Sequence, residues 1–551
     1  MRGAIFAAIL AASLSTIFHS DRASAQGVLP TTASQQPLTA EQWREDLRFM
    51  AAEMKKRHAN LYHTVSPQAF DAAVADLDRR IPTLQRNQII VGMMRIAAMV
   101  GDGHTRVDPR KDKAFSFPSL PLKLYDFDDG IYVRAVMPGQ EALLGARIEA
   151  VGGVPVVEAR KRIAPLVSGD NLMAERMMTP LYLAMPDVLQ AVGLSDRRDT
   201  ATLTLVKNGR RRTATVKAAA VDPPWPPDTD ISLITPAGWV DARKAPVPMW
   251  LEEPLNLHRL IGVPERGLVY AQLNQGTDYK GETLDAYGEK IAALAREQNP
   301  RALVFDLRLN YGGNGDIRHE LLRSLIRAED DDTRLFVLTA RGSFSATQFM
   351  LEDLARLSHG LLVGEPASGK PISHGDAYRS VMPNSGITVR TSIVFWKHGQ
   401  DTRPWTPIDI AVPYRFADYV AGRDPVLEAA LTYRAQPSLL EKLNGAAKAG
   451  GPAAAVAALK AYADDPVHRY DDVPGTGIRA IERMDDNPSA LAASRWLAER
   501  YPTARDPQVL YALLAGELGS KAEALTAARA ALTLDPNNRQ ARSVIERLSA
   551  K

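Results

Sequence analysis

The chain of 551 residues contains no cysteine. This excludes disulfide bonds, thiol nucleophiles and cysteine-ligated metal sites, and it excludes a lipid anchor on a cysteine after a signal sequence. An excess of charge of one sign is also missing, because 67 basic residues stand against 64 acidic ones. So small a net charge gives no electrostatic reason to bind nucleic acid or an anionic membrane surface, and we expect neither as a partner.

Long apolar runs are absent after the N-terminus. Residues 1–25 combine Arg2, a short apolar run from Ala4 to Leu14, and the small residues Ala23-Ser24-Ala25. This is the pattern of a secretory signal peptide, and the apolar run is shorter than the roughly 20 residues that span a bilayer. We therefore expect cleavage after Ala25 and a periplasmic or secreted protein without a stable membrane anchor.

Motifs for metals and nucleotides are missing as well. No His-Glu-x-x-His segment occurs, His58 and His63 are five residues apart, and no glycine-rich phosphate loop follows a strand. Such motifs are the usual sequence marks of zinc sites and of nucleotide sites. We expect neither a metal ion nor a cofactor.

The pattern of the remaining sequence predicts a multidomain α/β protein. Helical periodicity after Thr39 gives way to short strands from Phe115, and strands alternate with helices beyond the proline-rich segment DPPWPPDTD. Such an alternation indicates a parallel sheet covered by helices, which we expect the hairpin around residues 383–386 to complete. The expected parts are a signal peptide (1–25), a helical N-terminal region (26–114), a β-rich insert (115–221), an α/β core (222–435) and helical repeats (436–551).

Two of these parts resemble known modules. The segment LLGARIEAVGGVPVVEARKRI, inside the insert, resembles the carboxylate-binding half of a PDZ domain, although a plain β-rich spacer is an equal alternative. In the C-terminal part, two alanine-rich helical segments end at Pro502 and Pro536, 34 residues apart. This is the period of tetratricopeptide repeats, and the alternative is an unrelated helical cap.

Two serines stand at a predicted turn from a strand into a helix, in the segment RGSFSATQF. Most serines at helix starts are caps, and we expect Ser343 to be the cap of this helix. Ser345 then remains as a candidate nucleophile, because the free N–H groups of a helix N-terminus favour negative charge.

Two further segments lie at predicted strand ends. The first, VFDLRLNYGGNGD, places Asp306, Arg308 and Asn310 before the pair Gly312-Gly313, whose backbone N–H groups can face a ligand. We expect Asp306 and Arg308 to form a buried ion pair that shapes the glycine loop. The second segment, LLVGEPASGK, ends at Lys370, 25 residues after Ser345.

Together these three segments resemble the signature of the tail-specific, or C-terminal processing, serine peptidases. The resemblance covers Gly267 to about Leu431 and implies a crotonase-like α/β core. It implies that Ser345 is the nucleophile, that Lys370 is its general base, and that Ala346 and a glycine of the Gly312-Gly313 pair supply the oxyanion donors. A serine–lysine pair is a known variant of the catalytic triad.

The sequence departs from that family in several places. Gln348 replaces an acidic residue, and the segment PISHGDAY places His374 after the lysine. This form, with HANLYH and GDGHTRV, resembles a bacterial branch that is similar to tricorn-type peptidases and to retinoid-binding relatives. In tricorn-type relatives the histidine that corresponds to His104 acts with the serine, supported by a glutamate where this chain has Thr406 and Pro407. We favour Lys370 over His104 as the base.

The function expected from the sequence is that of an exported, cofactor-free serine endopeptidase that acts through an acyl-enzyme on Ser345. The substrate would be a peptide or a protein, and the C-terminal repeats would bind a protein partner or mediate self-association. The alternative is a catalytically inactive protein on the same fold that binds peptides or an apolar ligand.

Overall fold

The computed structural model describes residues 37–108, 117–219, 232–397, 401–518 and 520–550. The predicted signal peptide and the proline-rich segment lie outside the described residues. The chain divides into residues 1–39 and residues 40–551, and everything below concerns the second unit. No helix within the described ranges is both long and apolar enough to cross a membrane.

The second unit begins with helices, as predicted. Their apolar residues recur at three- and four-residue steps, so that Leu47, Met50 and Met54 are buried on one side of the first helix. Ser66 caps the second helix by accepting a hydrogen bond from the amide of Ala69. The three helices are α1 (Ala40–Arg57), α2 (Pro67–Arg80) and α3 (Arg86–Ala98).

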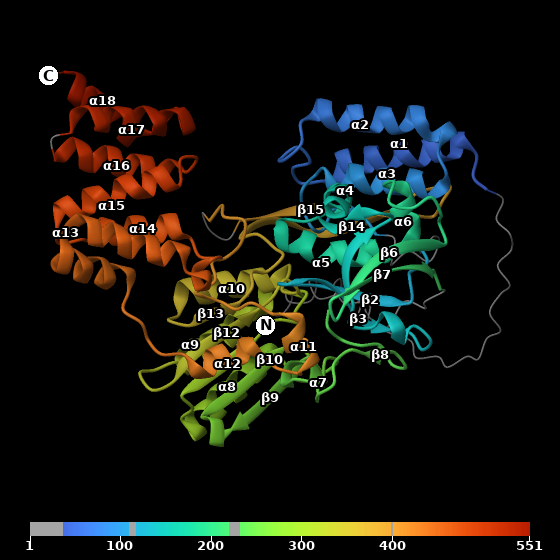
Figure 1. The fold of residues 1–551 in the computed structure, drawn as a ribbon, viewed down its shortest axis with the longest axis horizontal. Coiled ribbons are helices and arrows are strands. Elements are labelled where there is room, and N and C mark those ends of the chain that lie inside the picture. The colour runs from blue at the N-terminus through green and yellow to red at the C-terminus, as the bar shows by residue number, and fades with distance from the viewer. Residues whose placement is uncertain (1–36, 109–116, 220–231, 398–400, 519, 551) are drawn as a thin grey trace, which may run out of the picture. The chain divides into compact units, whose positions relative to one another are not determined.

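An antiparallel sheet with three helices follows (Figure 1). Its last hairpin turns at Asn208 and Gly209, and both residues have positive φ, as a two-residue turn between twisted strands requires. The strands are β2 (Leu122–Phe127), β3 (Gly130–Val136), β4 (Arg147–Val151), β5 (Val154–Pro155), β6 (Thr200–Lys207), β7 (Arg210–Lys217) and β8 (Val240–Asp241). The helices are α4 (Val156–Ile163), α5 (Leu172–Leu183) and α6 (Pro186–Ala191).

A six-stranded sheet forms the α/β core, in the order β16-β13-β12-β11-β10-β9. All neighbours in this sheet are parallel except β9 and β10, and β11 is buried along its whole length because both faces of the sheet are covered. Its strands are β9 (His258–Val263), β10 (Leu268–Leu273), β11 (Ala302–Asp306), β12 (Arg334–Thr339), β13 (Leu361–Gly364) and β16 (Ile410–Ala411).

Helices cover both faces of this sheet. Val269 and Ala271 of β10 point to one apolar core and Leu268 and Tyr270 to the other, as expected from the alternation of side chains along a strand. The first core contains α8 (Leu284–Gln298), α9 (His319–Arg327) and α10 (Ala346–Leu357). The second contains α7 (Met249–Glu252), α11 (Phe416–Val420) and α12 (Pro425–Thr432).

One prediction about this sheet was wrong. The hairpin of β14 (Ile372–Val381) and β15 (Thr388–Lys397) does not complete the parallel sheet. It forms a separate three-stranded antiparallel sheet with β1 (Arg106–Val107), in the order β1-β15-β14. The pairing of β1 with β15 brings the loop that follows α3 to the α/β core.

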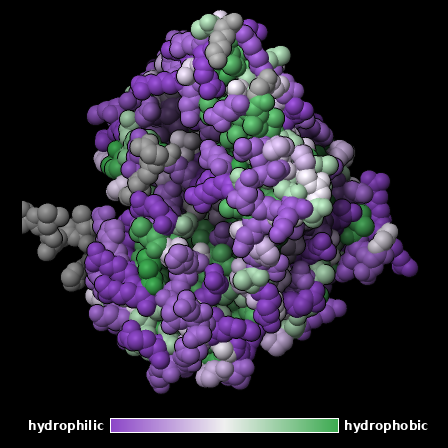
Figure 2. Space-filling view, turned by 90° about the vertical axis from the view of Figure 1, so that its left-hand side faces the viewer, coloured by the Kyte–Doolittle hydropathy of each residue, from purple (hydrophilic) through white to green (hydrophobic). Residues whose placement is uncertain are grey.

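The C-terminal part consists of successive helices that lie side by side (Figure 1). Two helix pairs repeat with an offset of 34 residues, since α15 and α17 begin at residues 487 and 521, and α16 and α18 at residues 505 and 539. The surface shown in Figure 2 is mostly hydrophilic, with hydrophobic residues in separate patches. The helices are α13 (Leu439–Asp464), α14 (Val473–Ile481), α15 (Asn487–Arg500), α16 (Arg505–Glu517), α17 (Lys521–Leu534) and α18 (Arg539–Ser549).

Candidate active site

The site is built around a strained turn between β12 and α10. Ser345 occupies the N-cap position of α10 with φ 58° and ψ −125°, and its side chain caps no helical N–H group. A non-glycine residue in such a conformation costs on the order of 1–3 kcal/mol and persists only where its surroundings hold it. A sharp strand-to-helix turn of this kind also exposes a serine hydroxyl beyond the edge of the sheet.

Ser343 holds this turn from beneath and is not the helix cap. The prediction that Ser343 caps the helix was wrong, because α10 begins at Ala346 and Ser345 occupies its N-cap position. The fully buried Ser343 hydroxyl donates a hydrogen bond to the carbonyl of Leu307 at 2.9 Å and accepts one from the hydroxyl of Thr339 at 3.2 Å. It therefore joins the ends of β11 and β12.

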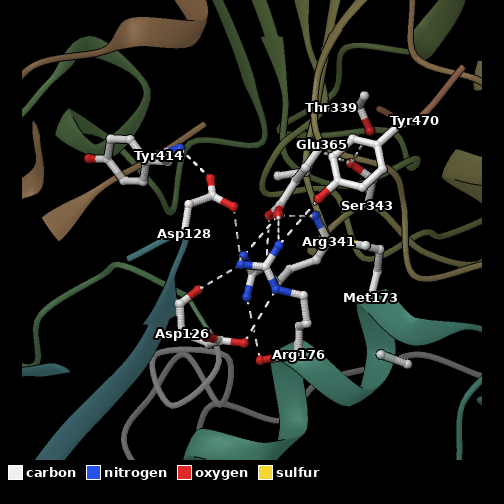
Figure 3. A network of polar contacts seen from close by, with 12 residues as sticks. Asp126, Asp128, Met173, Arg176, Thr339, Arg341, Ser343, Glu365, Tyr414 and Tyr470 are labelled. Carbon is white, nitrogen blue, oxygen red and sulfur yellow. Dashed lines mark hydrogen bonds and ion pairs between the residues drawn. The ribbon is translucent and has the colours of Figure 1, made fainter. Parts of the chain in front are cut away.

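A buried ion pair fixes the start of the same turn (Figure 3). The guanidinium of Arg341 donates to the carboxylate of Glu365, which follows β13, at 2.7 Å. Arg176 of α5 lies beside this pair, 3.5 Å from Glu365, and also contacts Asp126 of the antiparallel sheet at 3.3 Å. The α/β core, α5 and the antiparallel sheet thus share one charged network at the base of the Ser345 turn.

The structure places His104 against the serine. The Nε2 atom of His104 lies 3.0 Å from the Oγ atom of Ser345, although the two residues are 241 positions apart in sequence. The imidazole ring also stacks on the ring of Phe344, with centroids 4.5 Å apart. Sequence analysis named His104 but could not place it, because its position depends on the short strand β1.

A buried carboxylate holds the loop that carries His104. Asp102 accepts hydrogen bonds from the backbone amides of His104 and Thr105 at 2.9 and 2.7 Å, and from the hydroxyl of Ser392 at 2.7 Å. Its second oxygen lies 2.9 Å from Nε2 of His58. Burial acts to raise the pKa of Asp102, but the hydrogen bonds from His58 and Ser392 hold it well below its usual range. This role of Asp102 was not predicted from the sequence, although the aspartate lies in the segment GDGHTRV beside His104.

The surroundings of His104 favour its neutral form. Burial, followed by the positive charge of Arg106, lowers the pKa of His104 to about 4, with a smaller lowering from Arg390. The charge of Asp102 and the backbone carbonyl of His374 act to raise the pKa of His104, but they do not offset this lowering. Within the described part of the chain, the buried Nδ1 atom of His104 has no hydrogen-bond partner. A neutral imidazole beside a serine hydroxyl is able to accept its proton.

The glycine loop lies directly beside Ser345. A Cβ atom on Gly312 would stand 2.7 Å from Cβ of Ser345 and 3.1 Å from the amide nitrogen of Ala346, so only glycine fits there. The amide of Gly312 donates to Oδ1 of Asn310 at 2.9 Å and is therefore occupied. Among the described residues, no hydrogen bond engages the amides of Gly313 or Ala346. These two N–H groups are open to a developing negative charge.

The residues before the glycine loop support it. Arg308 and Asp306 form the predicted buried ion pair, at 2.6 Å, and Arg308 also binds Asp424 at 2.8 Å. The carbonyl of Asn310 accepts hydrogen bonds from the amide of Phe344 at 3.1 Å and from the hydroxyl of Thr347 at 2.9 Å. The end of β11 is thereby joined to the turn that contains the serine.

Lys370 lies near this centre but not on the serine. Its half-buried ammonium makes no hydrogen bond or ion pair with Ser345 in the described part of the chain, and it acts electrostatically on Asp170 and His374. His374 is buried, and its ring packs against those of His58 and His63 with centroids 5.0 and 4.2 Å apart. The structure therefore groups His374 with the N-terminal histidines.

Two departures from the family signature meet in space. Nε2 of Gln348 donates a hydrogen bond to the hydroxyl of Thr406 at 2.6 Å, and both side chains are buried. These are the positions where sequence analysis noted the loss of an acidic residue. A neutral amide–hydroxyl pair occupies that place in this chain.

A cleft of about 480 Å³ opens above the serine. Its wall includes polar side chains from β1, β14 and β15 and apolar side chains from α5. In the described ranges, no group of three or more histidine, aspartate and glutamate side chains is arranged to hold a metal ion. The residues that line the cleft are Gly103, His104, Arg106, Asp108, Ser168, Ala174, Met177, Met178, Tyr182, Tyr311, Phe344, Ser345, Ser368, Asp376, Ala377 and Arg390.

Comparison with known proteins gives a likeness in structure alone. No protein-family model matches the chain, and no curated protein matches it. The crystal structure of a CPAF mutant has a TM-score of 0.50 at 13% identity, over 72% of this chain and 99% of that one. CPAF complexed with lactacystin scores 0.46 at 14% identity, over 69% and 95%. The photosystem II D1 C-terminal processing protease scores 0.32 at 19% identity, over 71% and 99%. The chain thus shares its multidomain α/β fold with CPAF.

Proposed function

We propose that the protein is a serine peptidase in which Ser345 is the nucleophile and His104 is the general base. The observation that carries the proposal is the 3.0 Å distance between Nε2 of His104 and Oγ of Ser345. It is supported by the strained turn that exposes the hydroxyl and by the open amides of Gly313 and Ala346. The sequence signature of tail-specific peptidases, which covers the same turn and glycine loop, supports the same chemistry.

The proposed reaction begins with neutral His104, whose lowered pKa keeps it unprotonated at neutral pH. As Oγ of Ser345 attacks the carbonyl carbon of the peptide bond, Nε2 takes the hydroxyl proton and the carbonyl oxygen becomes an oxyanion. The amides of Gly313 and Ala346 stabilise that oxyanion. His104 then gives the proton to the departing amine, and a water molecule activated by the same imidazole hydrolyses the acyl-enzyme.

Lys370 has a supporting role in this proposal. The sequence favoured Lys370 as the base, but the side chain within hydrogen-bond distance of Oγ of Ser345 is that of His104. The ammonium of Lys370 acts electrostatically on the buried carboxyl of Asp170, whose Oδ2 atom would meet a Cβ on Gly103 at 3.3 Å. We infer that Lys370 stabilises the loop that holds His104.

A fluorophosphonate probe tests the proposal, because it reacts only with an activated serine. We expect labelling at Ser345 that is lost in Ser345→Ala and at least about 100-fold slower in His104→Ala, as a lost general base predicts. Lys370→Ala should slow labelling by less than about 10-fold. The matched control is His319→Ala, which changes an exposed histidine and should leave the labelling rate unchanged.

Two other results would decide against this assignment. If Lys370→Ala abolishes labelling while His104→Ala retains it, the base is Lys370. If the folded protein does not label at all, a non-catalytic protein that binds peptides or an apolar ligand becomes the better interpretation.

We further propose that the protein is exported and that its C-terminal helices bind a protein partner or a second copy of the chain. The export proposal rests on the sequence of residues 1–25, which lie outside the described residues. N-terminal sequencing of the protein from a periplasmic fraction tests it, since cleavage after Ala25 should leave Gln26 first. The helix pairs repeated at 34 residues support the binding role, and size-exclusion chromatography with light scattering measures self-association.

A further inference from the structure

Three arginines stand in a row across the small antiparallel sheet. Arg106 of β1 is the Cα partner of Arg390 of β15, and Arg390 is in turn the partner of Arg379 of β14. Residues directly opposite on neighbouring strands project from the same face of a sheet, and like charges in such positions destabilise it. A row of three arginines therefore concentrates positive charge on one face of this sheet.

The row leads into the cleft that contains Ser345 and His104. Arg106 and Arg390 both line that cleft, and Arg379 lies at the exposed end of the row. Arg106 already has partners, since it donates to the carbonyl of Gly103 at 2.7 Å and lies 3.7 Å from the carboxylate of Asp108.

Arg390 differs from Arg106 in this respect. Its side chain is half-buried, and among the described residues its guanidinium has no hydrogen-bond or ion-pair partner, with Nε buried. Burial, followed by the charges of Arg106 and Arg379, lowers the pKa of Arg390 to about 10. A partly buried guanidinium with unused donors binds a carboxylate more strongly than a neutral group. The charges are opposite, and the planar guanidinium can donate two parallel hydrogen bonds to the two carboxylate oxygens.

Among the described residues neither carboxylate of the cleft forms an ion pair with Arg390, and the charge of Asp108 offsets only part of the effect of Arg106 and Arg379 on its pKa. Asp108 lies 3.7 Å from Arg106 and is itself buried. Asp376 lines the cleft from β14, and no ion pair joins it to Arg390 among the described residues; burial, followed by the charge of Asp316, raises its pKa. The cleft thus has a guanidinium at Arg390 that forms no ion pair with a described residue, next to the proposed catalytic pair.

We propose that Arg390, supported by Arg106, binds a carboxylate of the peptide substrate inside the cleft. The inference rests on the proposed function and adds the substrate class to it, namely peptides that carry a carboxylate close to the scissile bond. Two sources share this chemistry, an acidic side chain and the C-terminal carboxylate of the peptide. The apolar part of the same peptide would contact the wall formed by α5, which contributes Met177, Met178 and Tyr182 to the cleft.

Four versions of one fluorogenic peptide test the proposal, with glutamate or glutamine beside the scissile bond and with a free or an amidated C-terminus. The full-length protein should cleave at least one carboxylate version about 10-fold or more faster, in kcat/KM, than its neutral counterpart. A glutamate preference identifies the side chain as the source, and a preference for the free C-terminus identifies the terminal carboxylate. Equal rates for all four versions would overturn the proposal.

Variants of Arg390 assign the preference to this residue. Arg390→Gln should remove the preference, so that the carboxylate version and its neutral counterpart are cleaved with equal kcat/KM in that variant. Arg390→Lys should retain part of it, and Arg390→Glu should favour a lysine peptide. The exposed Arg210→Gln, on β7, is the matched control and should change nothing. A preference that survives Arg390→Gln in a folded protein would refute the assignment.

A binding measurement separates this inference from the proposed function. Ser345→Ala should bind labelled carboxylate peptides more tightly than neutral ones, as measured by fluorescence anisotropy, and Arg390→Gln in that background should abolish the difference. This holds even if the wild type fails to react with a fluorophosphonate. Tighter binding of lysine peptides would instead show that Asp376, and not Arg390, determines the charge preference of the cleft.

Discussion

His104, the general base that we propose, is affected by the charges of the arginine row. Burial and the charges of Arg106 and Arg390 all oppose the imidazolium form of His104, so the histidine is a weaker base than a free imidazole but is unprotonated over a wider pH range. Asp102 acts in the opposite direction and favours the imidazolium that forms during the reaction. A substrate carboxylate at Arg390 would offset part of the arginine charge and make His104 more basic when the substrate is bound.

The pH dependence of kcat/KM reports this balance. His104 must be neutral to accept the serine proton, so activity should fall as the pH falls through about 4, well below the value for a free imidazole. Arg390→Gln removes a positive charge that lowers the pKa of His104, and the acidic limb should therefore move to higher pH. Arg210→Gln is the control, and a limb that stays in place in Arg390→Gln would contradict this electrostatic account.

At the scale of elements, the short strand β1 determines whether the site forms. The loop before β1 is joined to β15 by Asp102 and Ser392, whose hydrogen bond is 2.7 Å long. Ser392 is fully buried, and its backbone amide donates a further hydrogen bond to the hydroxyl of Thr105 at 3.0 Å. The position of His104 therefore depends on contacts between β15 and a loop far away in sequence, since Asp102 and Ser392 are 290 residues apart.

Two buried serines of this sheet make a matched pair of variants. Ser392→Ala and Ser380→Ala each remove a hydroxyl that donates to a carboxylate, that of Asp102 at 2.7 Å and that of Glu53 at 2.9 Å. Each change should lower the free energy of unfolding by about 1–3 kcal/mol, which urea denaturation measures. Only Ser392→Ala should also lower kcat, by about 10-fold, because it loosens the loop of His104. Equal kcat values for the two variants would show that this hydrogen bond does not position the base.

The elements of the α/β core could be predicted because their signals are local. Strand and helix patterns each depend on a few neighbouring residues, and the predicted alternation of strands and helices is present in the structure. The placement of β14 and β15 could not be predicted in this way, since a hairpin pattern does not specify its third partner. The contact of His104 with Ser345 follows from that non-local pairing, so sequence analysis lacked the geometry to choose between the two candidate bases.

For the whole molecule, two neighbouring carboxyl groups affect stability in opposite ways. The lowered pKa of Asp102 means that its contribution is present above the unfolded value of about 4 and is lost as the pH falls. Burial, together with the charge of Asp102, raises the pKa of Asp170 to about 8, and its Oδ2 atom has no hydrogen-bond partner in the described part of the chain. The unfolded chain ionises Asp170 above pH 4 more readily than the folded one.

The consequence is that Asp170 destabilises the fold as the pH rises from about 4 to about 8. Asp170→Asn should therefore gain stability relative to the wild type over this window, by a few kcal/mol, since each pKa unit corresponds to about 1.4 kcal/mol. Denaturant unfolding at pH 4, 6 and 8 measures the difference. Asp196→Asn, at an exposed aspartate, is the control, and a difference that does not change with pH would contradict the assignment.

The distance along the chain between His104 and Ser345 also has a meaning for biosynthesis. Their separation of 241 residues corresponds to roughly 10 to 50 s of translation at about 5–20 residues per second. During that interval the ribosome has made the base but not the nucleophile, and β15, which anchors the loop of the base, is synthesised later still. A nascent chain therefore carries no assembled pair of His104 and Ser345, and if the proposed function holds, the cell is not exposed to hydrolysis by this protein until synthesis of the core is complete.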